Sequence, residues 1–73
     1  MTIGETRVRV SFNPSGDNEV DEIKRLSAAL IDRCGDRKND SNVSGEEARL
    51  WSLAMTAYEE ACLWAVKALT INK

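Results

Sequence analysis

The sequence predicts an all-α fold, an antiparallel helical hairpin with an extended N-terminal arm that assembles as a homo-oligomer. Two segments, 17–34 and 44–70, repeat apolar residues at helical spacing, and a polar stretch separates them. The second segment carries more apolar surface than one partner helix can cover. The chain has only 73 residues, so its own core is marginal and self-association is expected. We expect a single domain, with an arm and turn over 1–16 and the hairpin over 17–73.

The arm is predicted from the alternation of residues 6–12. Val8, Val10 and Phe12 fall on one side, and arginines and a serine fall on the other. Period two is typical of a β-strand, but a lone strand has no partner in this chain. We therefore expect an extended arm that lies on the helices or on a neighbouring subunit. Residues 13–16, Asn-Pro-Ser-Gly, then favour a turn.

The first helix is expected from about residue 17 to Cys34. Asn18 is a plausible N-cap, and the acidic residues around it suit the positive end of the helix dipole. Gly35 is expected to end this helix as its C-cap. A polar loop over 35–43 follows, without apolar periodicity.

The second helix is expected to begin with a capping box formed by Ser44 and Glu47 and to run to about Thr70. A rise of 1.5 Å per residue makes it about 40 Å long, against about 25 Å for the first helix. Its apolar arc covers about 220°, where one neighbour needs little more than about 100°. An alanine seam lies at the centre of the arc, with bulky residues on both sides. Its members are Ala54, Ala57, Ala61, Ala65 and Ala68.

Copies of the chain are expected to cover the rest of this arc, because a soluble monomer tolerates no exposed apolar patch of that size. Trp51 and Trp64 lie within the arc. Packing is the simpler role for each ring, and stacking on a ligand is the alternative.

The composition argues against several classes of function. The chain has no histidine, and Cys34 and Cys62 lie on apolar helix faces outside any CxxC pair. We expect two buried thiols, with one disulfide as the alternative, no metal and no cofactor. No nucleophile elbow, phosphate loop or calcium motif is present, so an enzyme is not expected.

The net charge of −2, without a basic tract, argues against a polymeric nucleic-acid partner. Neither a signal peptide nor a run of about 18–20 apolar residues is present, so we expect no membrane and an intracellular protein.

One cluster indicates ligand binding. Phe12, Asn13, Pro14 and Ser15 come shortly before a helix N-terminus, and Lys24 lies on the border of that helix's apolar stripe. A ring, an amide, a hydroxyl and a cation can together stack a base and hold a phosphate. In the alternative interpretation Phe12 belongs to the core and Lys24 is solvated.

Three segments resemble the phage anti-CBASS cyclic-nucleotide sponges, whose hairpin domain is shared with an anti-Thoeris sponge. They are 12–16 (FNPSG), 20–25 (VDEIKR) and 58–69 (YEEACLWAVKAL). The likeness extends from about residue 8 to 70, and the E-E-A-x-x-W-A-V-K-A stretch is its most specific part.

The resemblance implies a compact hexamer of hairpins that sequesters cyclic dinucleotides such as 3′,3′-cGAMP, and in some members cyclic trinucleotides, without cleaving them. CBASS defence in the cytoplasm of the infected bacterium would then lack its signal. It also implies that Phe12 stacks on a base, that Lys24 reaches the phosphates, and that residues 13–15 line the pocket. The family aromatic is often tyrosine, so any contact through its hydroxyl is missing here. Arg49 and Lys67 are candidates for a second, trinucleotide pocket.

The rival hypothesis is an oligomeric helical interaction module whose wide apolar arc binds a host protein. It differs from the sponge hypothesis in one observable respect. A sponge forms a discrete oligomer by itself, whereas an interaction module stays monomeric until its partner is added.

Overall fold

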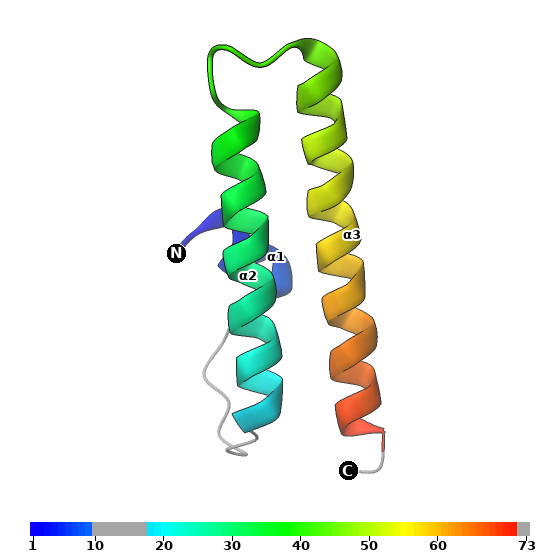
Figure 1. Cartoon of the computed structure of the whole chain (residues 1–73). Coiled ribbons are helices and arrows are strands. Elements are labelled where there is room, and N and C mark those ends of the chain that lie inside the picture. Colours follow the sequence, from blue (N-terminus) through cyan, green and yellow to red (C-terminus); the bar gives the residue numbers. More distant parts are fainter. Residues whose placement is uncertain (10–17, 72–73) are drawn as a thin grey trace.

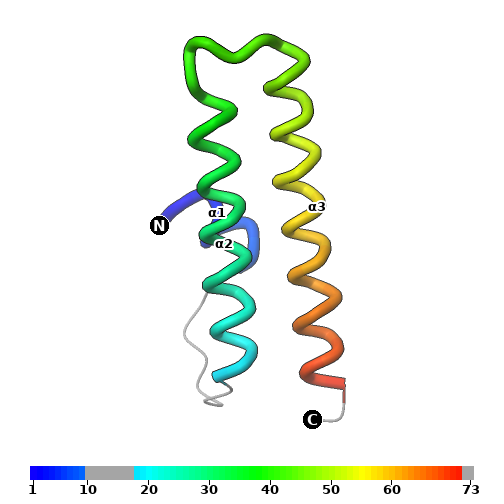
Figure 2. Tube along the Cα trace, viewed as in Figure 1, coloured from blue at the N-terminus to red at the C-terminus, as the bar shows by residue number. Residues whose placement is uncertain are grey.

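The computed structural model describes residues 1–9 and 18–71, and these residues form three helices and no strand. They are α1 (Ile3–Val8), α2 (Asn18–Lys38) and α3 (Gly45–Thr70). Helices α2 and α3 run antiparallel as a hairpin, and α1 lies beside α2 (Figure 1). The tube view shows the same arrangement, with the closed end of the hairpin formed by the loop between α2 and α3 (Figure 2). The predicted all-α hairpin is therefore confirmed.

The expectation of an extended arm is wrong for the described residues before position 10, because Ile3–Val8 are helical. A capping box starts this helix. The backbone N–H of Glu5 donates to the Thr2 hydroxyl at 3.0 Å, and the Thr2 N–H donates to the Glu5 carboxylate at 2.8 Å. These two hydrogen bonds satisfy donors that the first turn otherwise leaves free, and they outweigh the period-two pattern. Residues 10–17, which include the expected turn at 13–16, lie outside the described part.

Helix α2 continues to Lys38, four residues past its predicted end, so Gly35 is not a C-cap. Gly35 is a buried helical residue. A Cβ built on it would lie 3.5 Å from the terminal methyl carbon of Met55 on α3. The glycine therefore lies at the contact between α2 and α3, and α2 passes through it without ending.

Ser44 is the N-cap of α3, as expected, and its hydroxyl accepts from the Glu47 N–H at 3.1 Å. The reciprocal half of the predicted capping box is replaced by another contact. The Glu47 carboxylate accepts from the indole N–H of Trp51 at 3.0 Å, one turn further along α3. This hydrogen bond holds the Trp51 ring beside the core between α2 and α3.

The core lies between the three helices, and all three contribute to it. Ile31 is completely buried at its centre, and both cysteines are buried there as free thiols. The buried cluster consists of Val8, Ala28, Ile31, Cys34, Met55 and Cys62. The core is narrow because the molecule measures only 45 × 21 × 12 Å.

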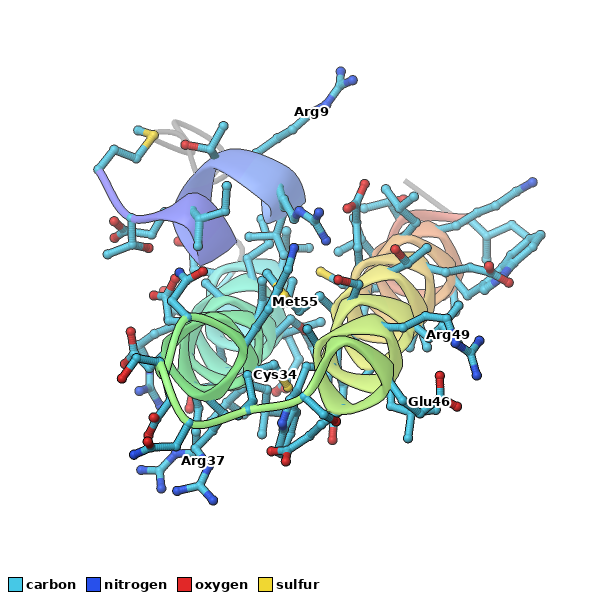
Figure 3. All side chains as sticks on the ribbon, turned by 90° about the horizontal axis from the view of Figure 1, so that it is seen from above. Arg9, Cys34, Arg37, Glu46, Arg49 and Met55 are labelled. Carbon is cyan, nitrogen blue, oxygen red and sulfur yellow. The ribbon has the colours of Figure 1, made fainter. Side chains whose placement is uncertain are left out.

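Much of the apolar arc of α3 is uncovered in the single chain. Leu53 and Trp64 are 54% and 62% exposed, and Ala57 and Ala61 are also exposed. Seen from above, α1 lies on one side of the hairpin only (Figure 3). The arc predicted from the sequence is therefore wider than the surface that α1 and α2 cover.

Candidate functional site

Helix α1 is fixed to α2 at Gly4. The Gly4 N–H donates to the carboxylate of Asp32 at 2.7 Å. A Cβ at this position would lie 2.1 Å from the backbone carbonyl oxygen of Ala28, so only glycine permits this approach. Val8, one turn later, is buried in the core. These contacts set the position at which the chain leaves α1.

Arg9 is the C-cap residue at which the chain leaves α1. It adopts a left-handed conformation, with φ 59° and ψ 50°, and its N–H donates to the carbonyl oxygens of Glu5 and Thr6. The Nζ of Lys24 on α2 donates to the carbonyl oxygen of Arg9 at 3.3 Å. Lys24 therefore lies at the start of the segment 10–17, whose residues are outside the described part.

Of the first group of predicted site residues, the structure places only Lys24. The ammonium group of this half-buried side chain is near the backbone that leads into the segment. Phe12, Asn13, Pro14 and Ser15 lie outside the described residues, so their predicted contact with a ligand stays a prediction. Phe12 follows Arg9 by three residues in the sequence, and three residues of chain span at most about 11 Å.

Two further cations, not predicted as site residues from the sequence, lie near this corner. The Arg9 side chain is exposed and extends away from the helices (Figure 3). Arg7 reaches α3, where its Nε lies 3.8 Å from the Glu59 carboxylate, and its buried Nη1 has no hydrogen-bond partner among the described residues. The Thr2-x-x-Glu5 capping signal could have revealed α1, and with it the position of both arginines.

The two candidates for a second pocket are separated along α3. Arg49 donates to Glu46 through Nε at 2.7 Å and Nη2 at 2.9 Å, and these hydrogen bonds lower the pKa of the Glu46 carboxyl. Lys67 lies over the ring of Trp64, with its Nζ 5.6 Å from the centroid. Eighteen residues of helix separate them by about 27 Å. One chain therefore does not bring Arg49 and Lys67 into a common pocket.

The arrangement suits anion binding. Lys24 and the exposed Arg9 supply positive charge at one corner, and positive charge suits a phosphate or another anion. Among the described residues no group of three or more metal-ligating side chains comes together. No helix in the same part of the chain is long and apolar enough to cross a membrane.

The described residues form a helical hairpin with a short, capped N-terminal helix, and comparison with known families specifies the class of protein. The family model of the Acb2/Tad1 hairpin domain matches residues 2–70, nearly the whole chain. The chain belongs to this family, which consists of sponge proteins that bind nucleotide signals and are not enzymes. No match was found among curated proteins or among solved structures.

Proposed function

We propose that this protein sequesters cyclic dinucleotides, such as 3′,3′-cGAMP, without cleaving them, and so deprives CBASS defence of its signal in the cytoplasm of the infected bacterium. The observation that carries the proposal is the family match over residues 2–70. The position of Lys24 supports it, because its ammonium group lies where the chain enters the segment that holds Phe12. Cyclic trinucleotides are proposed as a second ligand class.

The proposed ligand site combines stacking with charge. Phe12 stacks on a base, Lys24 contacts a phosphate, and residues 13–15 line the remaining wall. A homo-oligomer, which we propose to be a hexamer, holds these groups between rigid subunits. Little ordering is then needed when the ligand binds, and this favours the tight binding that sequestration requires.

Recovery of intact ligand tests sequestration directly. The protein is incubated with 3′,3′-cGAMP, unbound ligand is removed, and the protein is then denatured. We expect the released ligand to be unchanged by mass spectrometry, in an amount that reflects the bound fraction. Linear dinucleotide in the released material would show a nuclease, and no retained ligand would show that dinucleotides are not bound.

Lys24→Ala is expected to weaken dinucleotide binding by about tenfold or more while the oligomer stays intact. A hydrogen bond to a charged group contributes about 1.5–3 kcal/mol, and 1.4 kcal/mol corresponds to tenfold in affinity. Phe12→Ala is expected to have an effect of similar size through lost stacking. Isothermal titration calorimetry measures both changes.

Lys38→Ala is the matched control, because Lys38 is an exposed lysine at the other end of α2, about 21 Å from Lys24 along the helix. Equal losses in Lys24→Ala and Lys38→Ala would indicate a general charge effect. Unchanged affinity in Lys24→Ala would place the pocket elsewhere.

The exposed apolar face of α3 also favours the second candidate function, an interaction module that binds a host protein. The mass of the purified protein in solution distinguishes the two candidate functions. A discrete oligomer without any added partner supports the sponge, whereas a monomer that assembles only with a host protein supports the interaction module.

A further inference from the structure

One face of α3 carries a regular apolar stripe that α1 and α2 leave mostly uncovered, and only Ala54, at its edge, is half-buried against the core. Its residues are spaced alternately by four and three positions, the heptad spacing of helices that pack along one another. Three large members are each more than half exposed, at 52% for Leu50, 62% for Trp64 and 71% for Ile71. We name this surface the open stripe, and it consists of Leu50, Ala54, Ala57, Ala61, Trp64, Ala68 and Ile71.

The centre of the open stripe lies on another side of α3 from the face that packs in the core, which only Ala54 reaches from the edge of the stripe. Met55 and Cys62 mark the core face, and both are at most 5% exposed. At 100° per residue, the centre of the open stripe lies about 130° around α3 from them. Arg7 of α1 reaches α3 at Glu59, on the other side of the core face. The stripe is therefore available to another helix after the hairpin has formed.

We infer that the open stripe pairs with the same stripe of a second copy of this chain, with the two α3 helices antiparallel and related by a two-fold axis. This inference rests on the self-association proposed above and specifies which surface carries it. A two-fold interface requires a self-complementary surface, because the same residues meet on both sides. The sizes of the side chains along the stripe satisfy that requirement.

One antiparallel register matches large residues with small ones. When Trp64 faces Ala61 of the second copy, Ile71 faces Ala54 and Ala57 faces Ala68. Every layer between residues 54 and 71 then contains an alanine, and Leu50 lies outside this paired segment, so the helices approach closely without overlap of bulky groups. A parallel pair would instead place each Trp64 against its counterpart and leave thin alanine layers between the bulky ones.

Charge complementarity supports the same register. Glu60 and Lys67 border the open stripe on one side of α3, and both are exposed. In an antiparallel pair the residues that border the seam on one side face the same border of the second helix. The register above brings Glu60 of each copy near Lys67 of the other, so two opposite-charge contacts form across the axis.

The pair leaves apolar surface for a second type of contact. Leu26 and Leu30 on α2 are 47% and 43% exposed and do not belong to the open stripe. Helix α1 contacts α2 at Ala28, and Leu26 and Leu30 lie on the opposite side of α2. The two-fold pair is therefore a unit that further contacts can close into a larger ring.

Disulfide trapping between single-cysteine variants tests the register. A tagged Ala57→Cys chain and an untagged Ala68→Cys chain are mixed in denaturant, refolded together and oxidised mildly. We expect mixed 57–68 disulfide dimers to exceed self-linked dimers at least fivefold by non-reducing gel and peptide mass spectrometry. The two native cysteines are buried, and oxidised wild-type protein controls for them.

Thr56→Cys replaces Ala57→Cys as the control, because Thr56 is exposed on the polar face of α3. It is expected to form no disulfide with Ala68→Cys. Dominant 57–57 and 68–68 links would establish a parallel pair and overturn the inference. Absence of any 57–68 link would overturn it as well.

A charge reversal gives a second, independent test. Glu60→Lys is expected to weaken the pair about tenfold, because two favourable contacts become repulsive. The double variant Glu60→Lys with Lys67→Glu restores the contacts and is expected to recover the wild-type dissociation constant. Failure of the double variant to recover would contradict the register.

Ligand retention by the wild-type protein, measured with 3′,3′-cGAMP, separates this inference from the proposed function. Retained ligand without 57–68 links would refute the interface and leave sequestration standing. Trapped pairs that retain no ligand would refute sequestration and leave the interface standing.

Discussion

Arg9 is the described non-glycine residue with a positive φ, and its backbone determines how the chain leaves α1. A left-handed conformation costs about 1–2 kcal/mol for a residue with a Cβ, and glycine adopts it without that cost. Arg9 adopts this conformation at the point where its carbonyl oxygen accepts the hydrogen bond from Lys24. In the sequence, Arg9 lies within the alternating stretch 6–12, which is typical of a strand and conceals α1 and its C-cap.

Arg9→Gly is expected to be more stable than Arg9→Ala by about 1 kcal/mol in the free energy of unfolding. Both variants lose the arginine side chain, so the difference between them isolates the left-handed backbone. Urea denaturation at equal protein concentrations measures it. Equal stability of the two variants would show that the left-handed conformation is not maintained in solution.

The three helices differ in how far their sequences predict them. The two long helices follow from apolar periodicity over many turns, which local exceptions do not disturb. Helix α1 has only six residues, and the alternation of 6–12 concealed it. The end of α2 was misplaced because a glycine after an apolar stripe is typical of a C-cap, whereas Gly35 is a buried helical residue in contact with Met55. That contact depends on the tertiary structure, so the sequence around Gly35 does not reveal it.

Gly4→Ala is expected to destabilise the protein by about 1–3 kcal/mol, because the new Cβ would overlap the Ala28 carbonyl oxygen and α1 would have to move. The shift displaces Arg9 from Lys24, so dinucleotide binding is expected to weaken as well. Thermal unfolding and calorimetry measure the two effects.

Gly45→Ala is the control for Gly4→Ala, since a Cβ at Gly45 has no neighbour within 4 Å and alanine favours a helix. It is expected to leave stability unchanged or slightly raised. Equal stability of Gly4→Ala and Gly45→Ala would contradict the close packing of α1 on α2.

At the scale of the whole molecule, the single chain is a thin rod and not a compact domain. Its radius of gyration is 13.7 Å, whereas a compact chain of this length has about 11 Å. The sequence predicted that a single chain cannot bury all of its apolar surface, because the apolar arc of α3 is too wide for one partner helix. It did not predict which surface is left open, since that depends on the side of the hairpin on which α1 lies.

The candidate site is predictable only in part for a related reason. Lys24 follows from its place on the border of an apolar stripe, and the structure adds its contact with Arg9. The second pair, Arg49 and Lys67, shares a helix but no pocket within one chain. Any common pocket for them must combine residues of different copies, and the sequence of one chain does not contain that geometry.

The mass of the purified protein in solution tests the central claim, that copies of the chain cover one another and thereby frame the ligand sites. Sedimentation velocity at micromolar concentration, without ligand or partner, is the measurement. We expect one discrete species several times the 8.1 kDa of the chain, and about six times for the proposed hexamer. A folded, stable species of 8.1 kDa would contradict the account.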